Sequence, residues 1–166
     1  MVGECEISFQ LAFEQCAIGM ALVGTDGKWL WANSSLCEMI GYTEQELLAL
    51  DIKTITHKDD LKADLEYVRQ MLQGTIRTYN MEKRYLRKDG EIIWINLSVS
   101  LVRDTNDTPL YFILQIENIT ERKQAEESLK VGMRQIDDEK NKLESILSAI
   151  GDGNNDQAEK KRVFGM

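Results

Sequence analysis

The sequence predicts an α+β fold, in which an antiparallel sheet carries helices on one face and a long helix follows it. Apolar residues alternate with polar ones from Ile93 to Leu101, which is the pattern of a strand that buries one face. Asp-Gly pairs at 26–27 and 89–90 are typical of hairpin turns between antiparallel strands. From Ile119 the composition changes to Glu, Arg, Lys, Gln and Ala, which favours one continuous helix.

The chain is predicted to begin with an amphipathic helix in residues 1–17, because Phe9, Phe13 and Cys16 recur at helical spacing. A core domain follows and is predicted to begin with two short strands. They lie on either side of the first Asp-Gly turn, at 18–23 and 29–32.

Three helices are predicted after these strands. Asn33 is expected to cap a short first helix that Gly41 ends, and Thr43 with Glu46 forms a capping box at the start of a second. A longer third helix is expected to begin near Thr56. Its apolar face recurs at helical spacing and consists of Leu61, Leu65, Val68 and Leu72.

Three longer strands complete the predicted core domain, which spans residues 18–120. They are expected at 77–87, 93–101 and 110–116, and the second Asp-Gly turn joins the first two. The predicted order is therefore two strands, three helices and three strands, with the helices on one face of the sheet.

A heptad repeat runs along the predicted final helix, residues 121–151. Its apolar positions are Leu129, Met133, Ile136, Leu143, Leu147 and Ile150. Lys140 occupies the one polar position of this seam. We expect a coiled coil that forms a parallel homodimer, and the alternative is that the stripe packs back on the domain. Gly151 and Gly153 are expected to end the helix, and residues 152–166 to form a disordered tail.

The chain is acidic, with a formal net charge of −8 and a pI near 4.8. We therefore expect no binding to nucleic acid, because the phosphate backbone would be repelled. No apolar run approaches the ~20 residues of a membrane span, and the N-terminus lacks the pattern of a signal peptide. Cys5, Cys16 and Cys37 lack the spacing of a metal or redox site. These features predict a reduced, cytoplasmic protein.

Several motifs within residues 9–130 resemble those of PAS domains, a family of sensory modules. The stretches 13–23 and 33–47 are similar to the opening of bacterial members. The segment Ile-Thr-His-Lys-Asp-Asp-Leu at 55–61 resembles a family stretch in which proline is common at the position of Lys58. Each motif is weak alone, and together they are specific.

The second half of the chain adds to the resemblance. Residues 82–90 and Trp94 match the middle strands of the family, and 111–123 resembles its exit motif, usually written D-I-T-E-R-K. Asn118 stands where the family tends to use an aspartate that tethers the exit helix. The residues through which a signal would leave are accordingly Asn118, Ile119 and Thr120.

The resemblance implies a PAS fold, which is a five-stranded antiparallel sheet with helices on one face that encloses a small-molecule pocket or a packed core. Such domains usually precede a histidine kinase, a diguanylate cyclase or further PAS modules in bacteria. A C-terminal output domain in a longer protein is therefore the implied partner.

The candidate pocket residues share the apolar face of the predicted sheet or the facing helix. They are Leu61, Leu65, Val68, Leu72, Ile95, Leu97, Val99, Phe112, Leu114 and Ile116. This lining is apolar with few polar anchors, which suits a hydrophobic ligand or simply a packed core.

The cofactor stays open among none, FAD and haem. His57 and the methionines Met71 and Met81 are candidate haem ligands, although a histidine at a helix start also suits a bond to the backbone. Residues 51–56 lack the reactive cysteine of LOV-type photosensors. Three tryptophans either stack on a flavin or lie on the exposed or dimer-facing side of the sheet, namely Trp29, Trp31 and Trp94.

The sequence contains no Ser/His/Asp set, no metal-spaced cluster and no glycine-rich phosphate loop. Asp59 and Asp60 are adjacent and are expected to be helix-start charges, not an acid/base pair. We therefore predict a non-enzymatic sensor that relays a small-molecule, redox or similar cue through its dimeric helix. The alternative is a ligand-free module for protein interaction and dimerisation.

Overall fold

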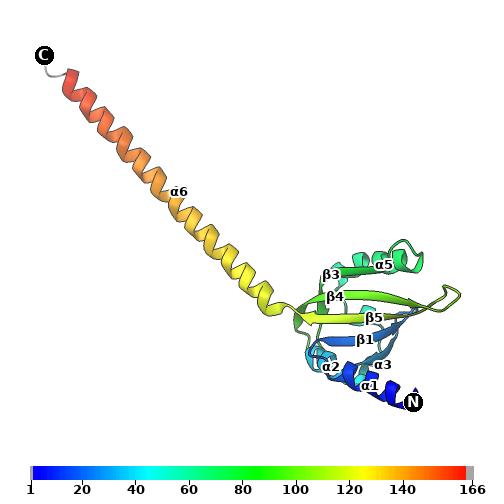
Figure 1. Ribbon diagram of the computed structural model, residues 1–166. Coiled ribbons are helices and arrows are strands. Elements are labelled where there is room, and N and C mark those ends of the chain that lie inside the picture. The colour runs from blue at the N-terminus through cyan, green and yellow to red at the C-terminus, as the bar shows by residue number, and fades with distance from the viewer. Residues whose placement is uncertain (1, 164–166) are drawn as a thin grey trace. The chain divides into compact units, whose positions relative to one another are not determined.

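The computed structural model describes the backbone of residues 2–163 and the side chains of residues 3 and 5–151. Contacts within the chain form two units, residues 1–121 and 122–166. The elements of the first unit, shown in Figure 1, are α1 (Val2–Glu14), β1 (Gly19–Gly24), β2 (Trp29–Ala32), α2 (Ser34–Ile40), α3 (Glu44–Leu48), α4 (Ile52–Ile55), α5 (Lys58–Leu72), β3 (Thr78–Leu86), β4 (Ile92–Arg103) and β5 (Pro109–Asn118).

The five strands form one sheet in the order β2-β1-β5-β4-β3, and every neighbouring pair is antiparallel. In β4, Ile95, Leu97 and Val99 are buried on one face, whereas Asn96 and Ser98 lie half-buried on the other. The register pairs Leu97 with Ile116 and Val99 with Leu114 of β5, both of which are also buried, because side chains that share a face of antiparallel strands lie opposite each other. The predicted alternation and the predicted five-stranded antiparallel sheet are confirmed.

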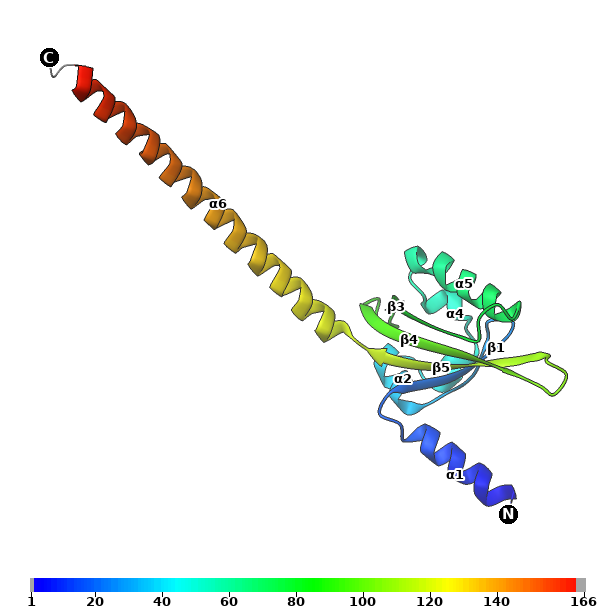
Figure 2. The same cartoon turned by 45° about the horizontal axis from the view of Figure 1, so that its top comes forward.

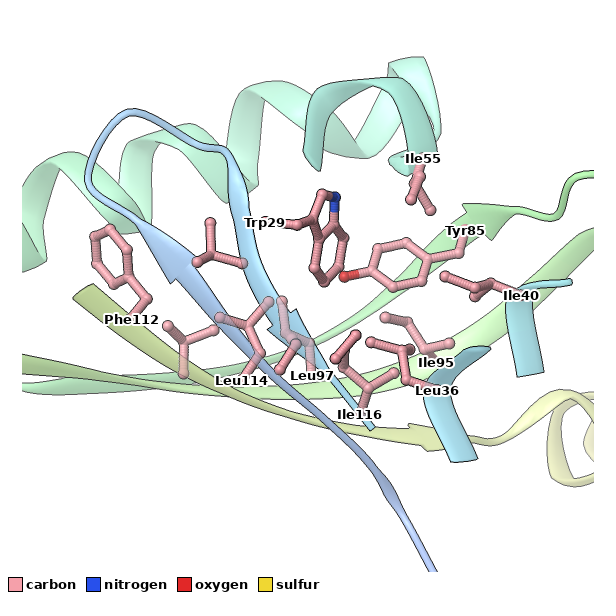
Figure 3. Close-up of a cluster of buried hydrophobic side chains, with 14 of the residues drawn as sticks. Trp29, Leu36, Ile40, Ile55, Tyr85, Ile95, Leu97, Phe112, Leu114 and Ile116 are labelled. Atoms are coloured by element: carbon pink, nitrogen blue, oxygen red, sulfur yellow. The ribbon is translucent and has the colours of Figure 1, made fainter. Parts of the chain in front are cut away.

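Helices α2 to α5 cover the inward face of this sheet (Figure 2). They contribute Leu36, Ile40, Leu47, Ile55 and Met71, all fully buried, to a single apolar core. Figure 3 shows several of these side chains packed against those of the strands. The predicted placement of the helices on one face is therefore confirmed.

The short helices begin and end where local chemistry predicts. Asn33 Oδ1 accepts a hydrogen bond from the backbone N–H of Leu36 at 3.1 Å and so caps α2. Gly41 ends that helix at φ 78°, in the left-handed region that glycine adopts without strain. Thr43 and Glu46 form the predicted capping box of α3, each side chain bonding the other residue's backbone N–H.

The region between α3 and α5 differs from the prediction. The separate short helix α4 was not predicted, and Asp51 caps it by accepting from the backbone N–H of Lys53 at 2.9 Å. Helix α5 begins at Lys58 and is capped by His57, not by Thr56. The Thr56 hydroxyl is turned inward and occupied by interactions in the core, so it does not cap the helix.

The last helix, α6, runs Thr120–Val163, so the predicted helix end at Gly151 is wrong. A glycine costs about 1 kcal/mol in a helix interior but does not by itself end a helix, and no proline follows it. The disorder predicted for 152–166 falls on residues whose side chains are not described, and 164–166 lie outside the described backbone. No helix in the described part of the chain has the length and apolar character that crossing a bilayer requires.

Candidate ligand cavity and exit segment

A cavity of about 150 Å³ lies between α5 and the inward face of the sheet, with the β1–β2 turn and α4 at its rim. Strands β1, β3, β4 and β5 contribute to its walls. The lining residues are Val23, Gly24, Thr25, Asp26, Gly27, Ile52, Lys53, Leu61, Asp64, Leu65, Val68, Tyr79, Val99, Phe112 and Leu114.

Ten residues were predicted to line a pocket, and the structure divides them into two groups. Those at the cavity are Leu61, Leu65, Val68, Val99, Phe112 and Leu114. Those outside its lining are Leu72, Ile95, Leu97 and Ile116. In the second group, Ile95, Leu97 and Ile116 belong to the apolar core and Leu72 packs against it. Ile95 and Ile116 lie beside Leu36 of α2 (Figure 3). Side chains of helices α2 to α4 pack on that part of the inward face.

The cavity has a buried carboxylate that the sequence reasoning did not single out. Asp64 of α5 is 3% exposed and accepts a hydrogen bond on Oδ1 from the Tyr79 hydroxyl of β3 at 2.7 Å. Burial, reinforced by the negative charge of Asp64, raises the pKa of Tyr79. The Tyr79 hydroxyl therefore stays protonated and acts as a donor to Asp64.

The second oxygen of Asp64 pairs with Lys83 of β3, whose side chain is fully buried. Lys83 Nζ lies 2.5 Å from Asp64 Oδ2 and donates a longer bond of 3.3 Å to Thr56 Oγ1. It also lies 4.9 Å from the ring centroid of Tyr85, as in a cation–π contact. Burial lowers the pKa of Lys83, whereas the charge of Asp64 acts in the opposite direction and favours the ammonium form.

The cavity lining is mainly apolar, and this buried Asp64–Lys83 pair is a polar anchor that the prediction did not include. Two signals in the sequence point to the pair. On α5, Asp64 lies three residues after Leu61 and Val68 lies seven residues after it, so all three share the inward face of the helix. Lys83 falls in the inward register of β3, where the alternate residues Tyr79 and Tyr85 are buried.

A second ion pair joins the same two elements one helical turn earlier. Asp60 of α5 accepts from Arg84 of β3 three times: from the backbone N–H at 2.8 Å, from Nε at 2.9 Å and from an Nη at 2.8 Å. These hydrogen bonds hold the pKa of Asp60 below its usual value. Asp60 is thus more than a helix-start charge, whereas Asp59 is largely exposed and lies 4.0 Å from the same guanidinium.

Arg84 also connects α5 to the segment where the sheet ends. Its guanidinium carbon lies 5.3 Å from the ring centroid of Trp94 of β4. The Trp94 backbone N–H donates to Thr120 Oγ1 at 3.0 Å, and its carbonyl accepts from the N–H of Ile119 at 2.9 Å. Asn118 Oδ1 accepts from the N–H and the hydroxyl of Thr120 at 3.0 and 2.6 Å. The predicted exit residues are therefore anchored on β4.

The candidate cofactor residues are dispersed. His57 Nδ1 accepts a hydrogen bond from the backbone N–H of Asp59 at 3.2 Å. Of the two predicted alternatives, a haem ligand or a bond to the backbone, the structure shows the bond to the backbone. Met71 is fully buried in the core and Met81 is half-buried. Among the described side chains, no group of three His, Cys, Asp or Glu residues is arranged to hold a metal ion.

The three tryptophans do not share one environment. Trp29 is 2% exposed in the core, so its predicted place on the outer side of the sheet is wrong (Figure 3). Trp31 packs against Phe13 of α1 at a separation of 4.4 Å between the ring centroids. The Trp94 ring contacts the guanidinium of Arg84. Because Trp29 is buried in the core, the three indoles do not share one exposed surface on which a flavin could stack.

Comparison with known proteins agrees with this architecture. The probable diguanylate cyclase DgcE of Escherichia coli is 49% identical over 126 residues, which is 76% of this chain and 11% of that protein. The sensor histidine kinase TmoS of Ectopseudomonas mendocina is 34% identical over 124 residues, 75% of this chain and 13% of that protein. The chain therefore spans only a small part of the length of either relative.

A solved structure supports the fold independently. The crystal structure of the PAS domain of a protein from Colwellia psychrerythraea matches with a TM-score of 0.65 at 17% identity, over 70% of this chain and 98% of that one. A family model described as PAS domain matches residues 17–121, which include the whole sheet and its covering helices. The chain belongs to the PAS domain family.

Proposed function

We propose that this PAS module senses occupancy of the cavity under α5 and relays it through α6 to an output domain of a longer bacterial protein. Its homology to PAS regions of a sensor histidine kinase and a diguanylate cyclase supports a role in sensory signal transduction. The relatives are named for a kinase and a cyclase, so we propose an output of one of these types. The chain itself is proposed to be non-catalytic, and its unpaired cysteines favour the cytoplasm.

One continuous set of contacts carries this proposal. Asp64 lines the cavity, and one turn away on α5 Asp60 holds Arg84. Arg84 lies on Trp94, whose backbone is bonded to Thr120 at the start of α6. A shift of α5 caused by a ligand would therefore act on the residues that anchor α6. The cavity also favours ligand sensing over a ligand-free interaction module.

A second copy of this chain is the proposed partner of α6. The six apolar seam residues are 56–65% exposed in the single chain. They recur at heptad spacing, and burying such a seam against an identical helix forms a parallel coiled coil. In a dimer, the exit segments of both copies would lead into one coiled coil. A small change in their geometry could then be transmitted along the paired helices.

The oligomeric state tests the relay helix. Leu143→Glu places a charge in the seam and is expected to shift the chain from dimer to monomer, as measured by sedimentation velocity over a range of concentrations. Ser145→Glu is the matched control, because Ser145 lies two residues away and outside the seam, and it should stay dimeric. The core domain should remain folded in both variants.

Two results would contradict this part of the proposal. One is a wild-type chain that remains monomeric at high micromolar concentration. The other is a Leu143→Glu variant with the same mass as the wild type.

A further inference from the structure

We propose that the cavity under α5 takes a small, mainly apolar molecule bearing a hydroxyl or amine, which donates a hydrogen bond to Asp64, and that it rejects carboxylates. This deepens the proposed function and rests on it for the cavity being the sensing site. The selection follows from three properties of the site: its volume, its inventory of donors and acceptors, and its balance of charge.

The volume limits the ligand to a fragment. A cavity of about 150 Å³ is the size that holds a single six-membered ring, and drug-sized ligands need roughly 300 Å³ or more. Its apolar walls are branched or aromatic, with Val68, Val99 and Phe112 among them. A compact hydrocarbon body suits these walls, whereas FAD and haem are too large for this space.

The polar groups of the cavity offer acceptors and few donors. The Tyr79 hydroxyl hydrogen is directed to Asp64 Oδ1, and Lys83 reaches Asp64 Oδ2 from the interior. A carboxylate oxygen accepts two hydrogen bonds, so each oxygen of Asp64 keeps unused capacity. A ligand that supplies a donor uses that capacity, and a purely apolar ligand leaves it unused.

Charge balance argues against an anionic ligand. Lys83 already neutralises Asp64 at 2.5 Å, so the cavity has no spare buried positive charge for a second carboxylate. A carboxylate placed next to Asp64 would meet like charge in a region of low dielectric. At the rim the cation Lys53 is exposed and is accompanied by Asp26, so the rim does not attract anions strongly.

Four probes of nearly equal size test the inference on the full chain: cyclohexanol, cyclohexylamine, methylcyclohexane and cyclohexanecarboxylate. Binding is followed by chemical-shift changes of cavity amides. We expect the preferred donor-bearing probe to bind roughly tenfold or more tightly than methylcyclohexane, since hydrogen bonds to charged groups contribute about that much. Comparison of the alcohol with the amine tells which donor the site prefers. We expect the carboxylate to bind more weakly than all three.

Three results would overturn the inference: equal binding of methylcyclohexane and both donor-bearing probes, tighter binding of the carboxylate than of either donor-bearing probe, or no binding by any of the four.

Two variants locate the effect. In Asp64→Leu combined with Lys83→Met the acceptor and its partner are removed together, and the donor-bearing probes should lose their advantage over methylcyclohexane. Val68→Phe fills the cavity and should abolish binding of all four probes. A preference that persists in the double variant, or binding that persists in Val68→Phe, would place the ligand elsewhere and overturn the inference.

The failure of this inference is distinguishable from failure of the proposed relay. Ligand preference is measured at the cavity, whereas the relay is measured as the distance between paired α6 helices. Selective binding of the donor-bearing probes without any change along α6 would overturn the relay and leave the ligand class standing. A change along α6 in Val68→Phe, with no preference for donor-bearing probes at the cavity, would overturn the ligand class and leave the relay standing.

Discussion

At Lys83 an ammonium group lies completely inside the protein, although dehydrating such an ion costs several kcal/mol. Asp64, Thr56 and the ring of Tyr85 surround it, so the ion is paired, hydrogen-bonded and in contact with an aromatic face. Removal of one charge would leave the other buried without a partner. Removal of both, with apolar side chains of similar volume in their place, would leave no unpaired buried charge.

Single and double substitutions at this pair should therefore differ. Lys83→Met alone is expected to lower the free energy of unfolding by about 3–5 kcal/mol, whereas Lys83→Met with Asp64→Leu should cost much less. Urea unfolding measures both, with Leu143→Glu added to every chain so that dimerisation does not contribute. A single variant within about 1 kcal/mol of its parent would contradict the role given to this pair.

The ion pair between Asp60 and Arg84 should make the free energy of unfolding depend on pH. Arg84 lowers the pKa of Asp60, so the pair adds stability above the unfolded pKa of about 4 and loses it as the pH falls through the lower, folded pKa. Asp60→Asn should cost about 1–3 kcal/mol at neutral pH, and its deficit should shrink on acidification below about pH 4. Chemical unfolding at a series of pH values measures this. Asp59→Asn is the control and should change little, and an Asp60→Asn deficit that is independent of pH would refute the assignment.

The residue pairs show where sequence reasoning stops. The periodicity of α5 identified Leu61 and Val68, which line the cavity, but not the buried Asp64 and Met71 of the same helix. It could not pair Asp64 with Lys83, because the two lie 19 residues apart and no local pattern connects them. An aspartate on the inward face of a helix and a lysine in an inward strand register were the two available signals, and only their tertiary contact explains both.

At the scale of elements, Asn33 ties the beginning of the domain together. Its side chain accepts from the backbone N–H groups of Met20 and Leu36 at 2.9 and 3.1 Å. It donates to the carbonyls of Phe13 and Ile18, both at 3.1 Å. The cap of α2 is therefore also the connection between the end of α1, the start of β1 and the end of β2.

Asn33→Ala should lower the free energy of unfolding by about 2–4 kcal/mol, because several buried backbone groups lose their partner. Asn33→Ser keeps a cap for α2 and should recover about 1 kcal/mol of that loss. Thermal or urea unfolding of the two variants provides the comparison. Equal stability of Asn33→Ala and the wild type would show that these bonds contribute nothing.

Element boundaries were predictable where their signals are local. Gly41 and the Thr43–Glu46 box mark helix ends through their own backbone and side-chain chemistry, and both predictions are confirmed. Thr56 also carries a capping side chain, but the buried Lys83 and the carbonyl of Ile52 engage it. The start of α5 therefore depended on a contact that sequence spacing does not reveal.

At the scale of the whole molecule, the chain consists of a PAS domain followed by a long helix. The first unit holds the PAS fold, the cavity and an exit segment bonded to Trp94. The helix α6 carries a heptad seam whose apolar residues are exposed in the single chain. We propose that a change at the cavity reaches the seam through Asp60, Arg84 and Trp94.

Pulsed electron-spin distance measurement tests this claim most directly. A nitroxide at Ser145→Cys, in a chain whose three native cysteines are replaced by serine, reports the distance between paired α6 helices. Filling the cavity with Val68→Phe is predicted to shift that distance distribution, and adding Arg84→Gln, which breaks the contact with Asp60, is predicted to remove the shift. Identical distributions in the wild type and Val68→Phe, with both chains dimeric, would contradict the relay.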